Sequence, residues 1–303
     1  MSVPEPVIPF RWDLVRGDRL GGMPLCASAS ASVSAPASTT HAPYRRPELV
    51  ACAAKVLARS GGGPVFFAGR SCDSIHDLLA AALRDTSHAT APRLLPFSSA
   101  GGLADLTPRE VRQWRANSAA HGFTPAAISR ASRTVALCDL VYKGGTFEDL
   151  YRLLRSWAED SREPWSVLRR KLRFVGIVVR GEASLKTWRW HQAAAWTREL
   201  PHTAVVNVAL DWPTWTYLGD CQPKLTASFT RDRWADHDIA PDRSEGTRRA
   251  LHEAERLIKY ARSRQGRADL VHHLVREPAF REPWLRTLVG ELRGTGAASR
   301  RLS

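Results

Sequence analysis

The sequence predicts an α/β protein: a parallel, mainly five-stranded sheet with helices on both faces, and a helical or irregular hood formed by the two ends of the chain. Short apolar runs alternate with stretches of helical periodicity. These runs lack the polar alternation of half-exposed strands, as expected where both faces of a sheet are covered. With 303 residues, 44% of them hydrophobic and 24% charged, the chain is long enough to bury a sizeable core.

Apolar runs bounded by turn residues are the expected strands. The second run contains Pro96, which cannot donate to a sheet ladder and therefore weakens that prediction. The fourth run is the clearest, because it is continuously apolar around a single glycine. The runs are Val65–Ala68, Leu94–Phe97, Thr134–Cys138, Phe174–Val179 and Ala204–Leu210.

Helices are expected between and after these strands. The segment Thr107-Pro108-Arg109-Glu110 has the form of a capping box, with proline at the first helical position and glutamate three residues after the threonine. Elsewhere the prediction rests on apolar residues at helical spacing. The further expected helices are Pro47–Arg59, Ile75–Leu83, Phe147–Trp157, Trp188–Leu200, Glu245–Arg262, Ala268–Val275 and Pro283–Leu292.

The composition indicates in which cellular compartment the protein works and which charge its ligand carries. Five scattered cysteines, none in a C-x-x-C pair, argue against a disulfide framework or a zinc site and predict a reducing, cytoplasmic environment. The sequence shows no apolar run long enough for a membrane span and no secretory signal. The formal charge of +14 favours an anionic ligand, but the basic residues are spread along the whole chain, which disfavours a dedicated nucleic-acid surface.

The strongest functional pattern is the stretch 135–146. A buried strand ends in Asp139, and a short loop through Lys143 leads to Gly144, Gly145 and Thr146 at the start of a helix. Glycines and a helix N-terminus let backbone N–H groups approach a phosphate, and the threonine hydroxyl can add a further donor. The acid suits ribose hydroxyls or a hydrated Mg²⁺. An ordinary strand-to-helix turn is the alternative interpretation of the same residues.

This stretch resembles the motif of type I phosphoribosyltransferases that binds 5-phosphoribosyl 1-pyrophosphate (PRPP). Cys138-Asp139 occupy the positions of the family's acid pair, and Leu140-Val141 those of the two aliphatic residues that follow. The resemblance implies that Asp139 alone holds the ribose hydroxyls, with a catalytic role. It also implies that Tyr142, Lys143, Gly144, Gly145 and Thr146 bind the 5-phosphate, where Lys143 stands in place of the usual threonine.

A second strand-to-helix turn supports the resemblance. In the family, the loop after the first core strand holds pyrophosphate, and here the matching residues are Ala68, Gly69, Arg70 and Ser71. Arg70 is expected to neutralise the leaving group and so to act in catalysis; a solvated cation at a helix end is the other interpretation. Mg²⁺ is the implied cofactor, carried by PRPP, with Asp139 as a candidate ligand.

The resemblance divides the chain into three parts. Residues 1–45, which include the Ala/Ser-rich stretch 26–43, form an arm and part of the hood. Residues 46–210 form the phosphoribosyltransferase-like core, and residues 211–303 an acceptor loop and helical extension. Within the core, residues 98–133 are expected to close over the site. Asp211, Trp212 and Trp215 directly follow the fifth strand and are the candidate acceptor-binding residues.

The expected activity is therefore transfer of 5-phosphoribosyl from PRPP to a nitrogen or oxygen of a small-molecule acceptor, releasing pyrophosphate. An acceptor in the biosynthesis of an aminoglycoside or a nucleoside rests on family analogy alone. One alternative is a non-catalytic PRPP-binding regulator, associated with nucleic acid, and another is an unrelated phosphate-binding α/β protein. A homodimer is left open. Metalloprotease, nucleophile-elbow and Walker A motifs are absent from the sequence.

Overall fold

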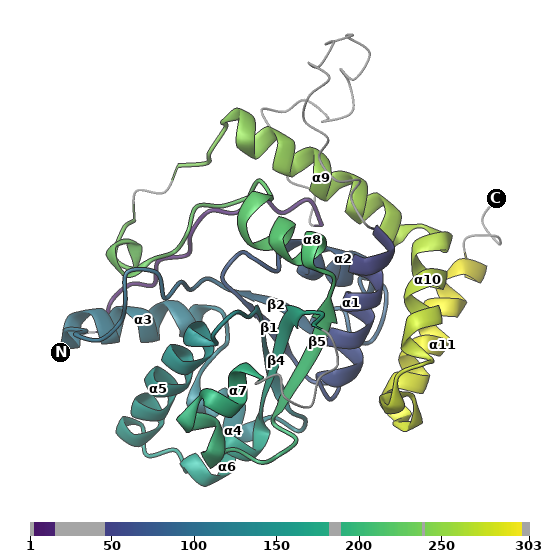
Figure 1. Ribbon diagram of the computed structural model, residues 1–303. Helices are drawn as coiled ribbons and strands as arrows, with labels where there is room; N and C mark the ends of the chain where they lie inside the picture. The colour runs from purple at the N-terminus through teal and green to yellow at the C-terminus, as the bar shows by residue number, and fades with distance from the viewer. Residues whose placement is uncertain (1–2, 16–45, 182–188, 238–239, 299–303) are drawn as a thin grey trace.

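The fold is built on a five-stranded, all-parallel sheet with the strand order β2-β1-β3-β4-β5. The computed structural model describes residues 3–15, 46–181, 189–237 and 240–298. The sheet lies at the centre, with helices on both sides (Figure 1). The strands are β1 (Val65–Ala68), β2 (Pro92–Leu95), β3 (Val135–Leu140), β4 (Leu172–Val179) and β5 (Val205–Leu210).

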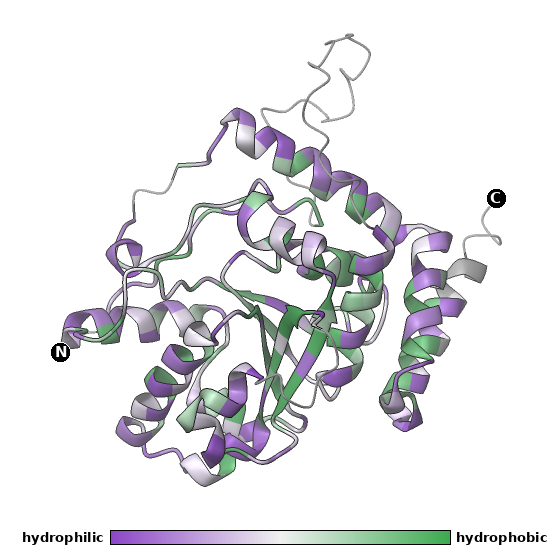
Figure 2. Cartoon of the chain, in the orientation of Figure 1, coloured by the Kyte–Doolittle hydropathy of each residue, from purple (hydrophilic) through white to green (hydrophobic). Residues whose placement is uncertain are grey.

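Two sets of helices cover the two faces of the sheet. On one face α1 and α2 lie directly on the strands, α9 packs on α2, and α10 packs on α1 with α11 beside it. These helices are α1 (Arg46–Arg59), α2 (Asp73–Ala82), α9 (Glu245–Arg262), α10 (Arg264–Leu274) and α11 (Pro283–Ala298). Figure 2 shows the strands in green, the colour of hydrophobic residues, as a sheet covered on both faces requires.

The other face carries an aromatic core. Phe147 and Tyr151 of α5 pack on Phe174 of β4, and Trp196 packs edge-to-face on Phe174 with 4.9 Å between the ring centres. The elements on this face are α3 (Pro108–Ala120), α4 (Pro125–Arg130), α5 (Gly145–Asp160), α6 (Trp165–Lys171), α7 (Trp190–Ala193) and the 3₁₀ helix η1 (Ala195–Glu199).

The strand predictions and most helix predictions agree with the structure to within a few residues. The second strand ends at Leu95, immediately before Pro96, because proline has no N–H to contribute to the ladder. The capping box is confirmed: the Thr107 side chain accepts from the Glu110 N–H, and the Glu110 side chain accepts from the Thr107 N–H. The stretch 26–43 lies outside the described residues.

One expectation on the second face was wrong. The helix expected over 188–200 is broken at Ala194, where ψ is 106°, so only the short helices α7 and η1 form; Trp188 lies outside the described residues. The hydroxyl of Thr197 donates to the carbonyls of His191 and Ala194, and these hydrogen bonds stabilise the non-helical backbone between α7 and η1. The segment 98–133 contains α3 and α4 and places side chains such as Phe123 in the core, and its residues 98–100 and His121 line the pocket described below.

Across the described residues, none of the helices combines the length and the apolar composition that crossing a membrane requires.

An N-terminal arm, residues 3–15, crosses the carboxyl end of the sheet as an extended chain. Figure 1 draws it in purple beside the green segment that follows the short helices after β5, and the Thr226 hydroxyl there donates to the Phe10 carbonyl. Helix α3 holds the arm through Asn117, which accepts from the Val7 N–H at 2.7 Å. At the other end of the arm, the Trp12 indole donates to the Asp242 carbonyl.

Arg11 is the main anchor of the arm. Its guanidinium lies between two aspartates one turn apart on α2, with Nη2 at 2.8 Å from Asp77 Oδ1 and Nε at 3.6 Å from Asp73 Oδ1. The side chains of Arg11, Asp73 and Asp77 are 11%, 8% and 3% exposed, so the charges are largely desolvated. Removing one partner of such a group leaves uncompensated buried charge.

We expect Arg11→Met to lower the free energy of unfolding by about 3 to 5 kcal/mol, since both buried aspartates then lose the guanidinium between them. Urea unfolding followed by circular dichroism measures this. The control is Arg152→Met, which removes an exposed ion pair with Glu148 and is expected to cost about 0.5 kcal/mol or less. Equal effects of the two substitutions would contradict the anchoring role of Arg11.

Candidate functional site

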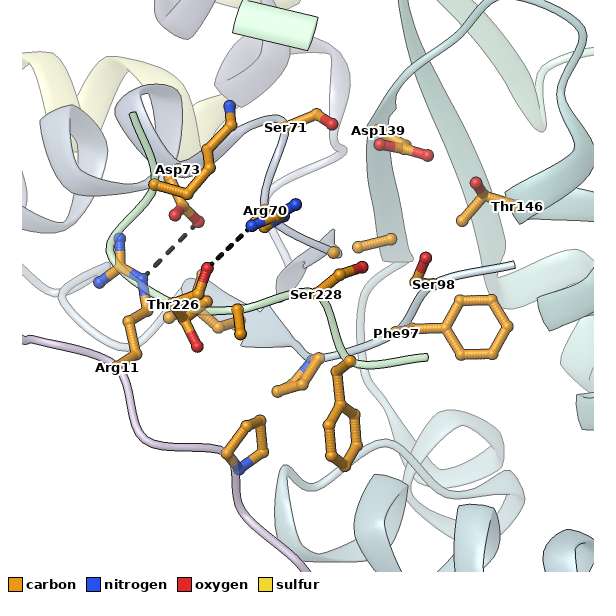
Figure 3. A pocket seen from close by; sticks show the side chains of 18 of the residues that line it. Arg11, Arg70, Ser71, Asp73, Phe97, Ser98, Asp139, Thr146, Thr226 and Ser228 are labelled. Atoms are coloured by element: carbon orange, nitrogen blue, oxygen red, sulfur yellow. Dashed lines mark hydrogen bonds and ion pairs between the residues drawn. The ribbon is translucent and has the colours of Figure 1, made fainter. Parts of the chain in front are cut away.

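The strand order places a topological switch between β1 and β3. From β1 the chain first moves outward to β2 and then returns to β3 on the other side of β1. In open parallel sheets, ligands bind at such a switch, outside the carboxyl ends of the strands. A cavity of about 740 Å³ lies there, and the loops after both strands line it (Figure 3).

The loop after β1 forms one wall of the pocket. All four residues expected to bind pyrophosphate, Ala68, Gly69, Arg70 and Ser71, line it. Gly69 has φ of +65°, and a Cβ atom there would stand 2.9 Å from the carbonyl oxygen of Phe97, so this tight turn requires glycine. The Arg70 guanidinium is held by a 3.1 Å hydrogen bond to the Thr226 carbonyl. The wall thus places a cation beside the start of α2.

Asp139 forms the opposite wall, at the end of β3. Its Oδ1 accepts from the Leu140 N–H at 2.7 Å, and the side chain is largely buried. Burial raises the pKa of this carboxyl to about 7, although hydrogen bonds from the Leu140 backbone and the Thr146 side chain act in the opposite direction. The Thr146 hydroxyl also lies 3.4 Å from that of Ser99. Asp139 is therefore a group that titrates near neutral pH.

The loop between Asp139 and α5 is only partly turned toward the pocket. Thr146 lines it, whereas Tyr142 and Lys143 are exposed and lie outside it, with the Lys143 Nζ 5.8 Å from the centre of the Tyr142 ring. Gly144 has φ of +84°, and a Cβ atom there would stand 2.4 Å from Trp190. Gly145 begins α5 with open space around it. Of the expected 5-phosphate residues, only Thr146 contacts the pocket.

Cys138 faces the opposite side of the sheet from Asp139 and does not line the pocket. Successive side chains of a strand point to opposite faces, so the residue before Asp139 enters the core under α1 and α2. Burial there, together with a hydrogen bond to Cys72, raises the pKa of the Cys138 thiol well above its ordinary value. The residue at the first acid position of the motif therefore makes no contribution to the pocket.

Several pocket residues were not anticipated from the sequence. Lys224, half-buried, donates to the carbonyl of Leu218 and to the Gln222 side chain, and burial lowers its pKa, with Arg70 acting in the same direction. Asp73 has one carboxylate oxygen without a hydrogen-bond partner, and burial raises its pKa despite Arg11. No motif surrounds Lys224 in the sequence, since it enters the pocket from a segment without regular structure.

The remaining pocket walls come from the N-terminal arm, the loop after β2, the end of α3 and the segment around Phe229. Ile8 and Pro9 of the N-terminal arm line the cavity, as do Phe97 and Phe229. His121, at the end of α3, also lines it, and burial lowers the pKa of its imidazole. One side of the pocket is thus apolar, and the side formed by the strand loops carries the polar groups, as Figure 3 shows for Arg70, Asp73 and Asp139.

The residues expected to bind an acceptor do not line this pocket. Asp211 caps the short helix α8 (Trp212–Thr216), its Oδ1 accepting from the Thr214 N–H at 3.1 Å. Trp212 is 60% exposed and stacks on Trp215 at a ring-centre distance of 5.9 Å. The Trp215 indole donates to the carbonyl of Ile177 at the end of β4. These side chains lie over the β4–β5 part of the sheet edge.

In the part of the chain that the structure describes, no cluster of three or more His, Cys, Asp or Glu side chains could hold a metal ion. Mg²⁺ commonly keeps water and phosphate oxygens and takes only one or two carboxylates from a protein. The Asp139 carboxylate, which lines the pocket, fits that requirement.

Comparison with known proteins adds no relative: no family model, no curated protein and no solved structure matches the chain.

Proposed function

We propose that the pocket at the β1–β3 switch binds PRPP and that the protein transfers its 5-phosphoribosyl group to a small-molecule acceptor. One observation carries the proposal: the loop after β1, with Gly69 and Arg70, lines the same cavity as Asp139 and Thr146, which stand at the two ends of the loop after β3. A substrate with a phosphate at each end of a sugar needs two such loops and a hydroxyl-binding group between them. The resemblance of residues 135–146 to the PRPP motif points to the same ligand.

Each wall then has a role. Arg70 and the N–H groups of the β1 loop hold the pyrophosphate, whose leaving becomes easier as its charge is neutralised. Thr146 and the first N–H groups of α5 hold the 5-phosphate at the positive end of the helix dipole. Asp139 accepts hydrogen bonds from the ribose hydroxyls and keeps C1 of the sugar oriented toward the acceptor.

The reaction breaks the C1–O bond to pyrophosphate and forms a bond from C1 to the acceptor nitrogen or oxygen, which loses a proton. Positive charge develops on the ribosyl ring in between, so a site that holds both phosphate groups and excludes water favours the transfer. Mg²⁺ would supply charge neutralisation on the pyrophosphate. The apolar wall of Ile8, Pro9 and Phe229 would help to keep water away from C1.

The second candidate function is a PRPP-binding regulator without turnover. It is favoured by the orientation of Cys138, which leaves Asp139 as the carboxylate that the end of β3 presents to the pocket. Such a protein would bind PRPP through the same walls, and its partner would respond to the bound state.

Calorimetric titration with PRPP in the presence of Mg²⁺ tests both candidates. Binding is expected for both, whereas release of pyrophosphate in the presence of pooled amine and hydroxyl acceptors is expected for the transferase alone. If the folded protein has no measurable affinity for PRPP, both candidates are wrong. Binding without turnover, with a change in nucleic-acid affinity in salt-dependent gel retardation, would favour the regulator.

Asp139→Asn is expected to weaken PRPP binding about tenfold to hundredfold, because hydrogen bonds to a charged acceptor are lost. In the unsubstituted protein the pKa of about 7 leaves the carboxyl partly protonated at neutral pH. The ionised form is the better acceptor, so affinity should rise as the pH increases through 7 and then level off. Calorimetry across this range measures it.

The difference between the two pH profiles isolates Asp139, because PRPP itself titrates equally in both titrations. The rise in affinity through pH 7 should be absent from the Asp139→Asn profile. If the unsubstituted protein and the variant have parallel profiles, Asp139 does not bind the ligand in its ionised form.

Lys224→Met is expected to weaken binding of both PRPP and free pyrophosphate about tenfold, since a half-buried cation beside Arg70 is removed. Lys259→Met is the matched control: it removes the same charge from the exposed surface of α9. Calorimetry with each ligand provides the measurement. A similar loss in both variants would reflect net charge instead of contact with the ligand.

A further inference from the structure

A second hollow lies at the opposite end of the sheet. It has a volume of about 570 Å³ and is bordered by Pro64, which precedes β1, and by Val135, which begins β3. Residues of α4, such as Ile128, form another side, and Phe66 of β1 contributes to the floor. We call it the amino-end hollow, because the parallel strands begin there and run toward the pocket at their other ends.

The charged side chains that line the amino-end hollow are all positive. Its lining includes Arg93 and Arg133 and no aspartate or glutamate. Within the part of the chain that the structure describes, neither arginine forms an ion pair. A carboxylate does contact one lining residue, since Glu291 accepts from the backbone and hydroxyl of Ser87. The hydroxyl-bearing residues Thr90 and Ser132 line the hollow as well.

Arg93 is held in an orientation that leaves one edge of its guanidinium available. Its Nε donates to the Thr90 carbonyl at 3.2 Å, and its central carbon lies 5.6 Å from the centre of the Phe66 ring. Stacking on an aromatic ring and a fixed Nε reduce the conformational freedom of the side chain. The two terminal nitrogens then have no acceptor among the described residues, and they form the fork that matches two oxygens of a phosphate.

His88, which also lines the hollow, carries no positive charge at neutral pH. Its ring packs against that of Trp284, with 5.5 Å between the ring centres. Burial lowers the pKa of His88, and Arg133 acts in the same direction, although Glu291 opposes them. The neutral imidazole is left as a hydrogen-bonding group beside the two arginines.

We propose that the amino-end hollow binds a small molecule bearing a phosphate or diphosphate group, with Arg93 contacting two phosphate oxygens and Arg133 adding charge from the opposite side. The volume is sufficient for a nucleoside diphosphate. Such cavities are within the ordinary size range of ligand sites. The proposal is independent of PRPP binding at the switch, because no residue lines both cavities.

The test uses the full chain carrying Arg70→Met, so that anion binding at the switch pocket is weakened first. Calorimetric titrations with inorganic phosphate, pyrophosphate and ADP are then compared in this background, with Arg93→Met or Arg130→Met added. Arg130 is exposed on the neighbouring helix α4 and does not line the hollow, so its substitution controls for the lost charge. Thermal unfolding of each variant checks that the fold is retained.

We expect millimolar or tighter binding of at least one of these compounds in the Arg70→Met background. Arg93→Met should weaken it at least about tenfold, as for a lost charge-assisted hydrogen bond, and Arg130→Met should leave it unchanged. Arg93→Lys, which keeps the charge and loses the fork, should give an intermediate loss. The proposal is overturned if none of the three compounds binds, or if Arg93→Met and Arg130→Met have equal effects. Loss of PRPP binding in Arg70→Met does not bear on it.

Discussion

The pairing of β1 with β3 is the constraint on which the candidate site depends. The two strands are parallel neighbours, with Phe67 opposite Cys138, so their carboxyl ends lie side by side. Because the chain leaves these ends in opposite directions, neither following helix covers the gap between them. The gap becomes a cavity, and Arg70 and Asp139 both line it. A different register would carry one of these loops out of the cavity.

Alternation along β3 decides which polar groups the cavity receives. Asp139 lies at the pocket, and its neighbour Cys138 enters the apolar core, where a carboxylate would be costly to bury. A cysteine at that position packs under α1 and α2 and, being uncharged, needs no oppositely charged neighbour. On the other face of the strand, the burial of Asp139 itself raises the pKa of its carboxyl to about 7.

Those parts of the site that depend on residues close together in the chain could be predicted from the sequence. Continuous apolar runs marked the strands, and the glycines near Arg70 and Thr146 marked the turns, because a turn must satisfy its own backbone within a few residues. Arg11 and Lys224 reach the cavity from segments without regular structure, so no periodicity could indicate where they lie.

Trp212 and Trp215 follow β5 as expected, but they do not reach the pocket. The cap by Asp211 and the hydrogen bond from Trp215 to the Ile177 carbonyl direct them along the edge of the sheet. The segment 188–200 does not form one helix, because tertiary packing that buries both Trp190 and Trp196 outweighs its local helical preference.

The N-terminal arm has a consequence for the order in which the molecule assembles. Val15 accepts a hydrogen bond from Arg262, and Trp12 donates to the carbonyl of Asp242, so these two contacts of the arm can form only after a segment 230 or more residues later in the chain has been made. The sheet can pair and cover itself well before then, because its strands are complete at Leu210. Closing so long a loop is slow relative to local folding. One end of the wall that the arm gives to the cavity can therefore be fixed only after all five strands of the sheet have been made.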